Sequence, residues 1–252
     1  MSADLLLRPL RGVPRISMGD DLAEIALEGI KRQKDRLVGG DVLVFAQKIV
    51  SKAEGRTVIL SDVIPSAHAK ELSNKTGKDA RLVELILQES SEVLRCRPGL
   101  LIVLHRLGFV LANAGIDRSN VGGDNRALLL PLDPDKSAAK IREDLRKKTS
   151  QNVAVLIIDS IGRAWRQGTI GMAIGSSGLP TLLDLRGRPD LDGRPLESTE
   201  IGLADELAAA ASLAMGQADE GLPIVLARGV PYDRREGAAR DLLRPKESDL
   251  FR

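Results

Sequence analysis

The sequence predicts an α+β fold with mixed sheets and helices packed against them. Two largely apolar runs, at residues 41–50 and 153–158, have the length and composition of buried strands. Amphipathic patterns typical of helices lie between such runs, but strands and helices do not alternate regularly, as they would in a doubly wound sheet. A chain of 252 residues that is 43% hydrophobic can also bury a sizeable core without disulfides or structural metals.

The composition excludes several classes of protein. Aromatic residues make up 2% of the chain and the formal net charge is +2, which argues against a stacking platform for single-stranded nucleic acid and against a non-specific DNA binder. Cys96 is the single cysteine, so an internal disulfide is excluded and a reducing compartment is indicated. No apolar run approaches the roughly 20 residues of a membrane span, and the start of the chain does not resemble a signal peptide. We therefore expect a cytoplasmic protein without a nucleic-acid or membrane partner.

Signals for helices and strands can be followed in order through the first half of the chain. A helix is expected over residues 19–30, because Asp20 and Asp21 fall in its first turn and apolar residues recur at helical spacing, until Gly39-Gly40 stops the pattern. The other elements expected in this half are a strand at 41–50, a short apolar run at 58–60, helices at 66–74 and 79–94, and paired strands at 100–104 and 109–112.

The second half is expected to contain, in order, a polar loop at residues 117–126, a short strand at 127–130, a basic helix at 133–148, a strand at 153–158, a long Gly-rich and mostly non-helical segment at 161–198, an Ala-rich helix at 199–216 and a strand at 223–228. A loop as long as 161–198 inside a compact protein is usually functional or carries short strands. The charged tail from residue 231 is expected to be loosely held. No repeat or linker divides the chain, so a single unit over residues 1–252 is expected.

Three polar clusters lie at the ends of apolar strands, where loops commonly present functional groups. The first contains Gln47, Lys48, Ser51 and Lys52. Lys48 and Lys52 fall within or just after the expected strand at 41–50, where a charge requires a partner. Either phosphate oxygens hold the two ammonium groups, or both side chains reach solvent at the end of the strand.

The second cluster, residues 112–121, combines small residues with Asp117, Ser119 and Asn120. Such a tight turn can bind a metal ion or a nucleotide through its side chains. Turn formation alone also favours Asp, Ser and Asn, so both interpretations stay open for this cluster.

The third cluster, residues 157–168, places Asp159 and Ser160 at the mouth of a hydrophobic strand. A carboxylate and a hydroxyl are the hard oxygen donors that Mg²⁺ or Mn²⁺ uses beside phosphates. Arg163 and Arg166 are candidates for neutralising substrate anions. A solvated loop with a capping Asp is the alternative interpretation.

Taken together, these clusters resemble the coenzyme F420-0:L-glutamate ligase family, in its stand-alone bacterial-type form. The resemblance follows the chain from end to end, which makes it more specific than any single motif. The matching stretches are GDDL at residues 19–22, GDVLVFAQKIVSKAEGR at 40–56, ANAGIDRSNV at 112–121, LPLDPDKSA at 130–138, IIDSIGRAWRQG at 157–168, ADELAAAASLAMGQ at 204–217 and RPKESDLFR at 244–252.

The resemblance implies an acid–amino-acid ligase that extends the glutamate tail of a deazaflavin coenzyme. GTP would phosphorylate the terminal carboxylate of coenzyme F420-0, and the amine of L-glutamate would then attack the acyl phosphate, with release of GDP and phosphate. Glutamylated forms of the coenzyme would be substrates for later rounds. Relatives resemble intertwined homodimers with the active site near the subunit interface, so a homodimer is expected. The C-terminal flavin-binding domain of some bacterial relatives is not expected here.

The resemblance also implies roles for individual residues. Two divalent cations, Mg²⁺ or Mn²⁺, are expected, with K⁺ as a further candidate. Asp117 and Asp159 would ligate one cation, and Ser160 and Gln217 the other. Many relatives have Thr at the position of Ser160, which retains the hydroxyl. The residues expected to contact GTP are Val13, Pro14, Arg15, Ile16, Gln47, Lys48, Lys52, Asn120, Met215, Gly216, Gln217, Ala218, Asp219, Glu220, Gly221 and Leu222.

Two other functions use the same residues. A metal-dependent hydrolase of GTP or another phosphate ester would keep the cation site and release phosphate equally well without glutamate. A non-catalytic nucleotide-binding or structural protein would tolerate Asp117→Ala and Asp159→Ala. The presence of two carboxylates and two lysines together argues against the non-catalytic protein, because buried unpaired charges are costly.

Overall fold

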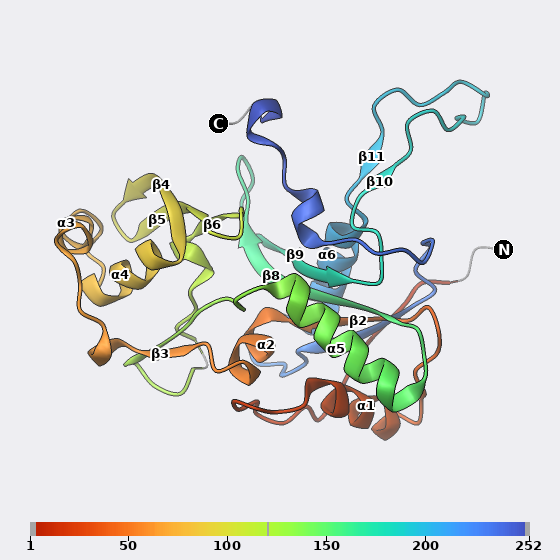
Figure 1. Ribbon diagram of the computed structural model, residues 1–252, viewed down its shortest axis with the longest axis horizontal. Coiled ribbons are helices and arrows are strands. Elements are labelled where there is room, and N and C mark those ends of the chain that lie inside the picture. Colours follow the sequence, from red (N-terminus) through yellow and green to blue (C-terminus); the bar gives the residue numbers. More distant parts are fainter. Residues whose placement is uncertain (1–3, 120, 250–252) are drawn as a thin grey trace.

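The computed structural model describes residues 4–119 and 121–249. Its larger part is built on a five-stranded sheet that contains β1 (Leu6–Pro9), β2 (Val42–Ala46), β8 (Ala154–Gly162), β9 (Thr169–Ser177) and β12 (Ile224–Arg228). The strand order is β1-β12-β2-β8-β9 (Figure 1). In this sheet β2 and β8 pair in parallel, and the other neighbours are antiparallel. The mixed sheet and its covering helices confirm the predicted α+β class.

Helices cover both faces of the sheet, because successive side chains of its strands point to opposite sides. Leu43 and Phe45 of β2 point into one hydrophobic core, and Val42 and Val44 point into the other. Helix α6 packs behind the sheet in Figure 1, and α5 lies in front of it. The helices on this part of the chain are α1 (Leu22–Arg32), α2 (Gln47–Ala53), α5 (Pro134–Thr149) and α6 (Leu203–Met215).

A smaller lobe lies to the left of the main sheet in Figure 1. It has its own core, in which Ile86 and Leu101 are fully buried. The strands expected at residues 100–104 and 109–112 are confirmed as an antiparallel pair in this lobe. Its elements are η1 (Leu60–Asp62), α3 (Ala67–Thr76), α4 (Ala80–Gln88), β4 (Ser90–Arg97), β5 (Leu100–His105), β6 (Val110–Ala112) and η2 (Asn113–Gly115), and the two-stranded ladder of β3 (Thr57–Ile59) and β7 (Arg126–Leu128) joins it to the rest of the molecule.

The strand predicted over residues 41–50 is wrong after Ala46, where the chain turns directly into α2. Ala46 keeps extended backbone angles and acts as the N-cap of the helix. Residues 47–53 contain good helix formers such as Gln and Lys, while Ile49 and Val50 are buried on the inner side. Lys48 and Lys52 therefore lie on a helix, one turn apart, and not within a strand.

The helix predicted over residues 79–94 is also too long. It ends at Gln88, and β4 begins at Ser90. The Ser90 hydroxyl donates to the Ile86 carbonyl and so binds one of the last free carbonyls of the helix. Pairing with β5 then draws residues 90–97 into the small sheet, which a local helical pattern does not reveal.

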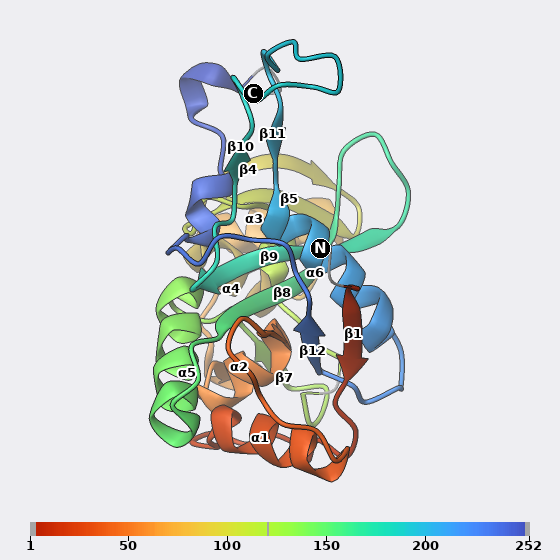
Figure 2. The ribbon, with the colours of Figure 1, turned by 90° about the vertical axis from the view of Figure 1, so that its right-hand side faces the viewer.

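The segment at 161–198, expected to be mostly non-helical, carries β9 and β10 (Leu183–Asp184), and β10 pairs with β11 (Glu200–Ile201). Glycine allows β9 to approach the helices closely. A Cβ atom on Gly171 would lie 2.4 Å from the Ala208 carbonyl oxygen of α6. One on Gly175 would lie 2.4 Å from the Pro134 carbonyl oxygen of α5. The loop between β10 and β11 projects from the molecule at the top of Figure 2.

The tail from residue 231 is held more firmly than predicted. Glu236 accepts a hydrogen bond of 3.1 Å from the Gly178 N–H and forms an ion pair with Arg142. Ala239 is fully buried at the start of η3 (Ala239–Leu242), which precedes η4 (Lys246–Ser248). The charge pattern of the tail does not predict these contacts, because the partners of Glu236 lie far away in the sequence. Within residues 4–119 and 121–249, none of the helices has the length and apolar character needed to cross a membrane.

Candidate functional site

A cavity of about 450 Å³ opens at the carboxyl ends of the parallel strands β2 and β8. Ala46 ends β2 and pairs with Ile158 of β8, so Gln47 and Asp159 follow side by side. The carboxyl ends of parallel strands are a common place for ligand sites, because the loops and helices that follow them diverge and leave a crevice. The cavity is lined by Val13, Pro14, Arg15, Ala46, Gln47, Lys48, Ile49, Lys52, Asp117, Ile158, Asp159, Ser160, Ser212, Met215, Gly216, Gln217, Ala218, Glu220, Gly221, Leu222 and Pro223.

Asp117 enters the cavity from the segment that joins β6 to β7. Its backbone is fixed by two hydrogen bonds with Leu128, of 2.9 and 2.8 Å. Its carboxylate lies 2.5 Å from the Lys48 Nζ atom and accepts hydrogen bonds from the N–H and hydroxyl of Ser119. Burial would raise the pKa of Asp117, but the hydrogen bonds from Lys48 and Ser119 outweigh burial and lower the pKa. Asp117 is therefore a charged carboxylate at neutral pH.

Asp159 has the opposite shift. Burial raises the pKa of its carboxyl to about 6, against the hydrogen bond from the Ser160 N–H, and the negative charge of Asp117 raises it further. Lys48 and the Gln47 amide lower the pKa by a smaller amount. Two carboxylates thus face the same cavity, and their mutual repulsion is relieved when positive charge lies between them.

Two glutamine amides approach these oxygen groups from different helices. Gln217, just after α6, accepts a hydrogen bond of 2.8 Å from the Ser160 hydroxyl. Gln47, the first residue of α2, lies beside Asp159 and is 3% exposed. Residues from three separate parts of the chain therefore meet within one cavity.

The cavity also gathers positive charge. Lys48, Lys52 and Arg15 line it together. Burial lowers the pKa of Lys52, and the neighbouring charge of Lys48 lowers it further. Such a cluster is suited to a polyanion such as a triphosphate, whose oxygens would offset the repulsion between the cations.

The residues predicted to hold divalent cations fit that role by their chemistry. Asp117 and Asp159 offer carboxylates, Ser160 a hydroxyl and Gln217 an amide carbonyl, and these hard oxygen donors match Mg²⁺ or Mn²⁺. Within the described part of the chain no group of three or more His, Cys, Asp or Glu side chains gathers as a metal site. Two carboxylates with neutral oxygens suit an ion that completes its coordination with phosphate and water.

The structure brings together most of the predicted site residues, although they are distant in sequence. Ile16 and Asp219 are exceptions, because neither lines the cavity, and Ile16 is buried in the core beside α1. Asn120 lies outside the described residues. Arg163 and Arg166 lie in the turn between β8 and β9, outside the cavity lining. Arg166 is exposed, and the half-buried Arg163 donates from its guanidinium to the Gly168 carbonyl. Their assignment to substrate anions stays a prediction.

Sequence reasoning missed the buried Ser212, which faces the cavity from α6. A signal for it was present: it is the only hydroxyl in the otherwise apolar stretch from Leu207 to Met215. Four apolar or small lining residues were missed as well, and they carry no chemical signal in the sequence: Ala46, Ile49, Ile158 and Pro223.

Known proteins resemble this chain over most of its length. A model of the family described as F420-0:Gamma-glutamyl ligase matches residues 12–229. The "Coenzyme F420:L-glutamate ligase" of Methanothermobacter thermautotrophicus is 47% identical over 245 residues, which cover 96% of this chain and 97% of that protein. Proteins of the same name from Methanocaldococcus jannaschii and Archaeoglobus fulgidus are 42% and 44% identical, covering 96% and 97% of this chain and 92% and 95% of their own. The chain belongs to the F420-0:Gamma-glutamyl ligase family.

Proposed function

We propose that this protein joins L-glutamate to coenzyme F420-0 and to the growing glutamyl tail, at the expense of GTP. The names of its relatives support the joining of F420 and glutamate. The observation that supports GTP dependence is that two carboxylates and three positively charged side chains line one cavity at the carboxyl ends of β2 and β8. Phosphoryl transfer depends mainly on positioning and on neutralising oxygen charge, and this cavity supplies the groups for both.

In the proposed reaction, the γ-phosphoryl group of GTP passes to the terminal carboxylate of the deazaflavin substrate, and GDP leaves. Lys48, Lys52 and Arg15 hold the triphosphate oxygens. The resulting acyl phosphate has phosphate as its leaving group, so the amine of L-glutamate attacks the carbonyl carbon, forms an amide and releases phosphate. The lone pair for the new bond comes from the unprotonated amine, which loses its proton as the amide forms.

Divalent cations, Mg²⁺ or Mn²⁺, would neutralise phosphate oxygens when bound. Asp117 and Asp159 would hold one cation, and Ser160 and Gln217 the other, with K⁺ as a further candidate. The end of α6 and the loop after it, from Met215 to Leu222, line the cavity except at Asp219 and are proposed to contact the nucleotide. Arg163 and Arg166 are proposed to meet the anionic tail of the coenzyme as it enters.

Mass spectrometry of the purified protein tests this function. Incubation with coenzyme F420-0, GTP, Mn²⁺ and L-glutamate is expected to yield products that differ by single glutamyl units, with no product when GTP is omitted. Asp159→Asn should lose the products, whereas Ser137→Ala, at a buried serine of α5 outside the cavity, should retain them. GDP release without glutamyl products would indicate the hydrolase. If folded protein forms neither GDP nor glutamyl products, only nucleotide binding remains as a function.

We further propose that the protein is a homodimer, as its resemblance to intertwined dimers implies. Size-exclusion chromatography with light scattering should give twice the mass of one chain. A monomer that retains full ligase activity would contradict this proposal without affecting the proposed reaction.

A further inference from the structure

Two buried serines contact the glutamine amides of the cavity from behind. Ser51 lies on α2 and is fully buried, and Ser212 lies on α6 and is 6% exposed. Each hydroxyl is hydrogen-bonded to one end of a glutamine side chain, Gln47 or Gln217, whose other end faces an oxygen group of the site. These hydrogen bonds hold the inner end of each amide, so that the other end faces the cavity.

Ser51 acts on Gln47 as a donor. Its hydroxyl lies 2.9 Å from Oε1 of Gln47, one helical turn earlier. With Oε1 engaged, the NH₂ end of the amide is left for the Asp159 carboxylate, which can only accept hydrogen bonds. A flipped amide would place its oxygen against the carboxylate, so Asp159 sets which end faces the cavity, while the Ser51 hydroxyl, which can donate or accept, holds the other end.

Ser212 acts on Gln217 as an acceptor. Nε2 of Gln217 donates to its hydroxyl oxygen at 2.7 Å, and Oε1 of the same amide accepts from Ser160 at 2.8 Å. The carbonyl oxygen is the end of an amide that can bind a cation. With the NH₂ end held by Ser212, this oxygen is directed to the side of Ser160.

The backbone of β9 restricts the position of Ser212. A Cβ atom added to Gly171 would lie 2.5 Å from the Ser212 Cβ atom and 2.4 Å from the Ala208 carbonyl oxygen. The strand therefore lies directly against this turn of α6, and the serine has little room to move. Its hydroxyl therefore accepts the hydrogen bond from the Gln217 amide at a fixed position.

We propose that Ser51 and Ser212 are positioning residues that hold the Gln47 and Gln217 amides in place, with an NH₂ group facing Asp159 and a carbonyl oxygen facing the cation site. The inference deepens the proposed function and rests on its cation site. Partners that orient metal ligands in this way commonly change metal affinity 10–100-fold when they are removed.

The test is the affinity of the full-length protein for Mn²⁺ in the presence of GDP, measured by isothermal titration calorimetry without catalysis. Ser212→Ala is expected to weaken Mn²⁺ binding about tenfold, and Ser51→Ala to weaken it in the same direction. Ser137→Ala is the matched control, since Ser137 is a buried helical serine bonded to Glu54 outside the cavity. It is expected to leave the affinity unchanged.

A double-mutant cycle separates positioning from a general structural role. In a Gln217→Ala background, Ser212→Ala should cause no further loss of Mn²⁺ affinity, and Ser51→Ala should cause none in a Gln47→Ala background. Additive losses, or unchanged affinity in the single variants, would overturn the inference. Should Ser212→Ala fail to fold, Ser212→Cys, which keeps the volume but accepts poorly, should weaken binding in its place. Absence of Mn²⁺ binding by the unaltered protein would instead refute the cation site of the proposed function, and the inference with it.

Discussion

Two aspartates face the same cavity, and their surroundings shift their pKa values in opposite directions. Asp117 accepts hydrogen bonds from Lys48 and Ser119, which lower its pKa, whereas burial raises the pKa of Asp159 to about 6. In the absence of a cation, the charged form of Asp159 therefore costs stability that a neutral residue would not. The two carboxylates repel each other, and a cation bound between them would remove this repulsion.

Asp159→Asn is expected to raise the melting temperature of the metal-free protein at pH 7.5 while abolishing ligase activity. An acid whose pKa is raised on folding loses stability as the pH rises from its unfolded value of 3.8 through about 6. The gain should be about 2–4 °C for each kcal/mol of repulsion removed, and it should shrink at pH 5, where Asp159 is largely protonated. Thermal unfolding in EDTA at the two pH values measures it. An equal shift at both pH values would contradict this explanation.

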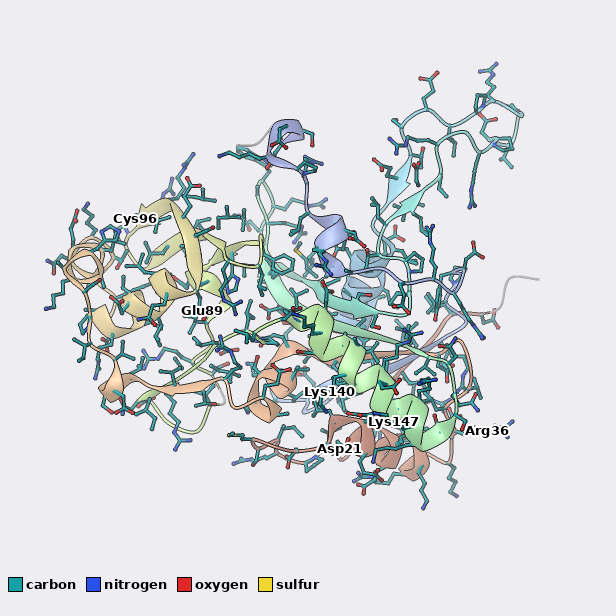
Figure 3. All side chains as sticks on the ribbon, in the orientation of Figure 1. Asp21, Arg36, Glu89, Cys96, Lys140 and Lys147 are labelled. Atoms are coloured by element: carbon teal, nitrogen blue, oxygen red, sulfur yellow. The ribbon has the colours of Figure 1, made fainter. Side chains whose placement is uncertain are left out.

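Glu89 illustrates the reverse case in the smaller lobe (Figure 3). Burial alone would raise its pKa, but the hydrogen bond with His105 and the charges of Arg56 and Arg106 outweigh it and lower the pKa to about 2. The Arg56 guanidinium also donates to the Leu130 carbonyl, so this network ties the end of α4 to the segment between β7 and α5.

Glu89→Gln should destabilise the protein by about 1–3 kcal/mol at pH 7, because the half-buried Arg56 and the exposed Arg106 lose a charged acceptor. An acid with a lowered pKa contributes stability above its unfolded value of 4.5, and this contribution disappears as the pH falls toward 2. Urea unfolding at pH 7 and pH 3 tests both statements. The difference between variant and unaltered protein should be smaller at pH 3, and a difference that grows on acidification would refute the assignment.

At the scale of elements, the approach of β9 to α6 depends on a single glycine. Gly171 is the third residue of β9, where any side chain would meet α6. The same helix carries Ser212 and leads into Gln217, so its position sets one side of the cavity.

Gly171→Ala is expected to cost about 1–3 kcal/mol of stability through overpacking and to weaken Mn²⁺ binding by displacing α6. Gly162→Ala is the control, since a Cβ atom at this end of β8 meets no other atom within 4 Å. Chemical unfolding and calorimetry would compare the two variants. Equal stability of both would show that β9 and α6 can separate without penalty.

Local sequence patterns predicted the elements best where a cap or an apolar stripe specifies the boundary. Asp133 is correctly predicted at the start of α5, where its side chain accepts a backbone N–H. Asp21, predicted in the first turn of a helix over residues 19–30, is instead the N-cap of α1, which begins at Leu22. Patterns failed at Ala46 and Gln88, since the change from strand to helix, or the reverse, depends on pairing with distant residues. Strand β1 was not predicted at all, because four residues at an edge give too weak a signal.

At the scale of the whole molecule, the proposed cation ligands come from both parts of the fold. Asp117 follows the small sheet of the lobe, while Asp159 belongs to the main sheet. Ligands that bind between these parts are expected to stabilise the folded molecule by mass action, by about 2.7 kcal/mol at a hundredfold excess over Kd.

Addition of Mn²⁺ and GDP should therefore raise the melting temperature by several degrees. Asp117→Asn should retain the fold but lose most of this shift, because one ligand then carries no charge. Differential scanning calorimetry with and without the ligands provides the measurement. An undiminished shift in Asp117→Asn would place the nucleotide and cation away from Asp117.

The sequence by itself determined the α+β class, the helices with clear caps and the three polar clusters, because these follow from local composition and spacing. Tertiary structure decided which clusters meet. Asp117 and Asp159 are 42 positions apart, and only the parallel pairing of β2 with β8 and the backbone bridge to Leu128 bring them to one cavity. It also decided where the glutamine amides lie, since Ser51 and Ser212 each hold one end of an amide by a hydrogen bond.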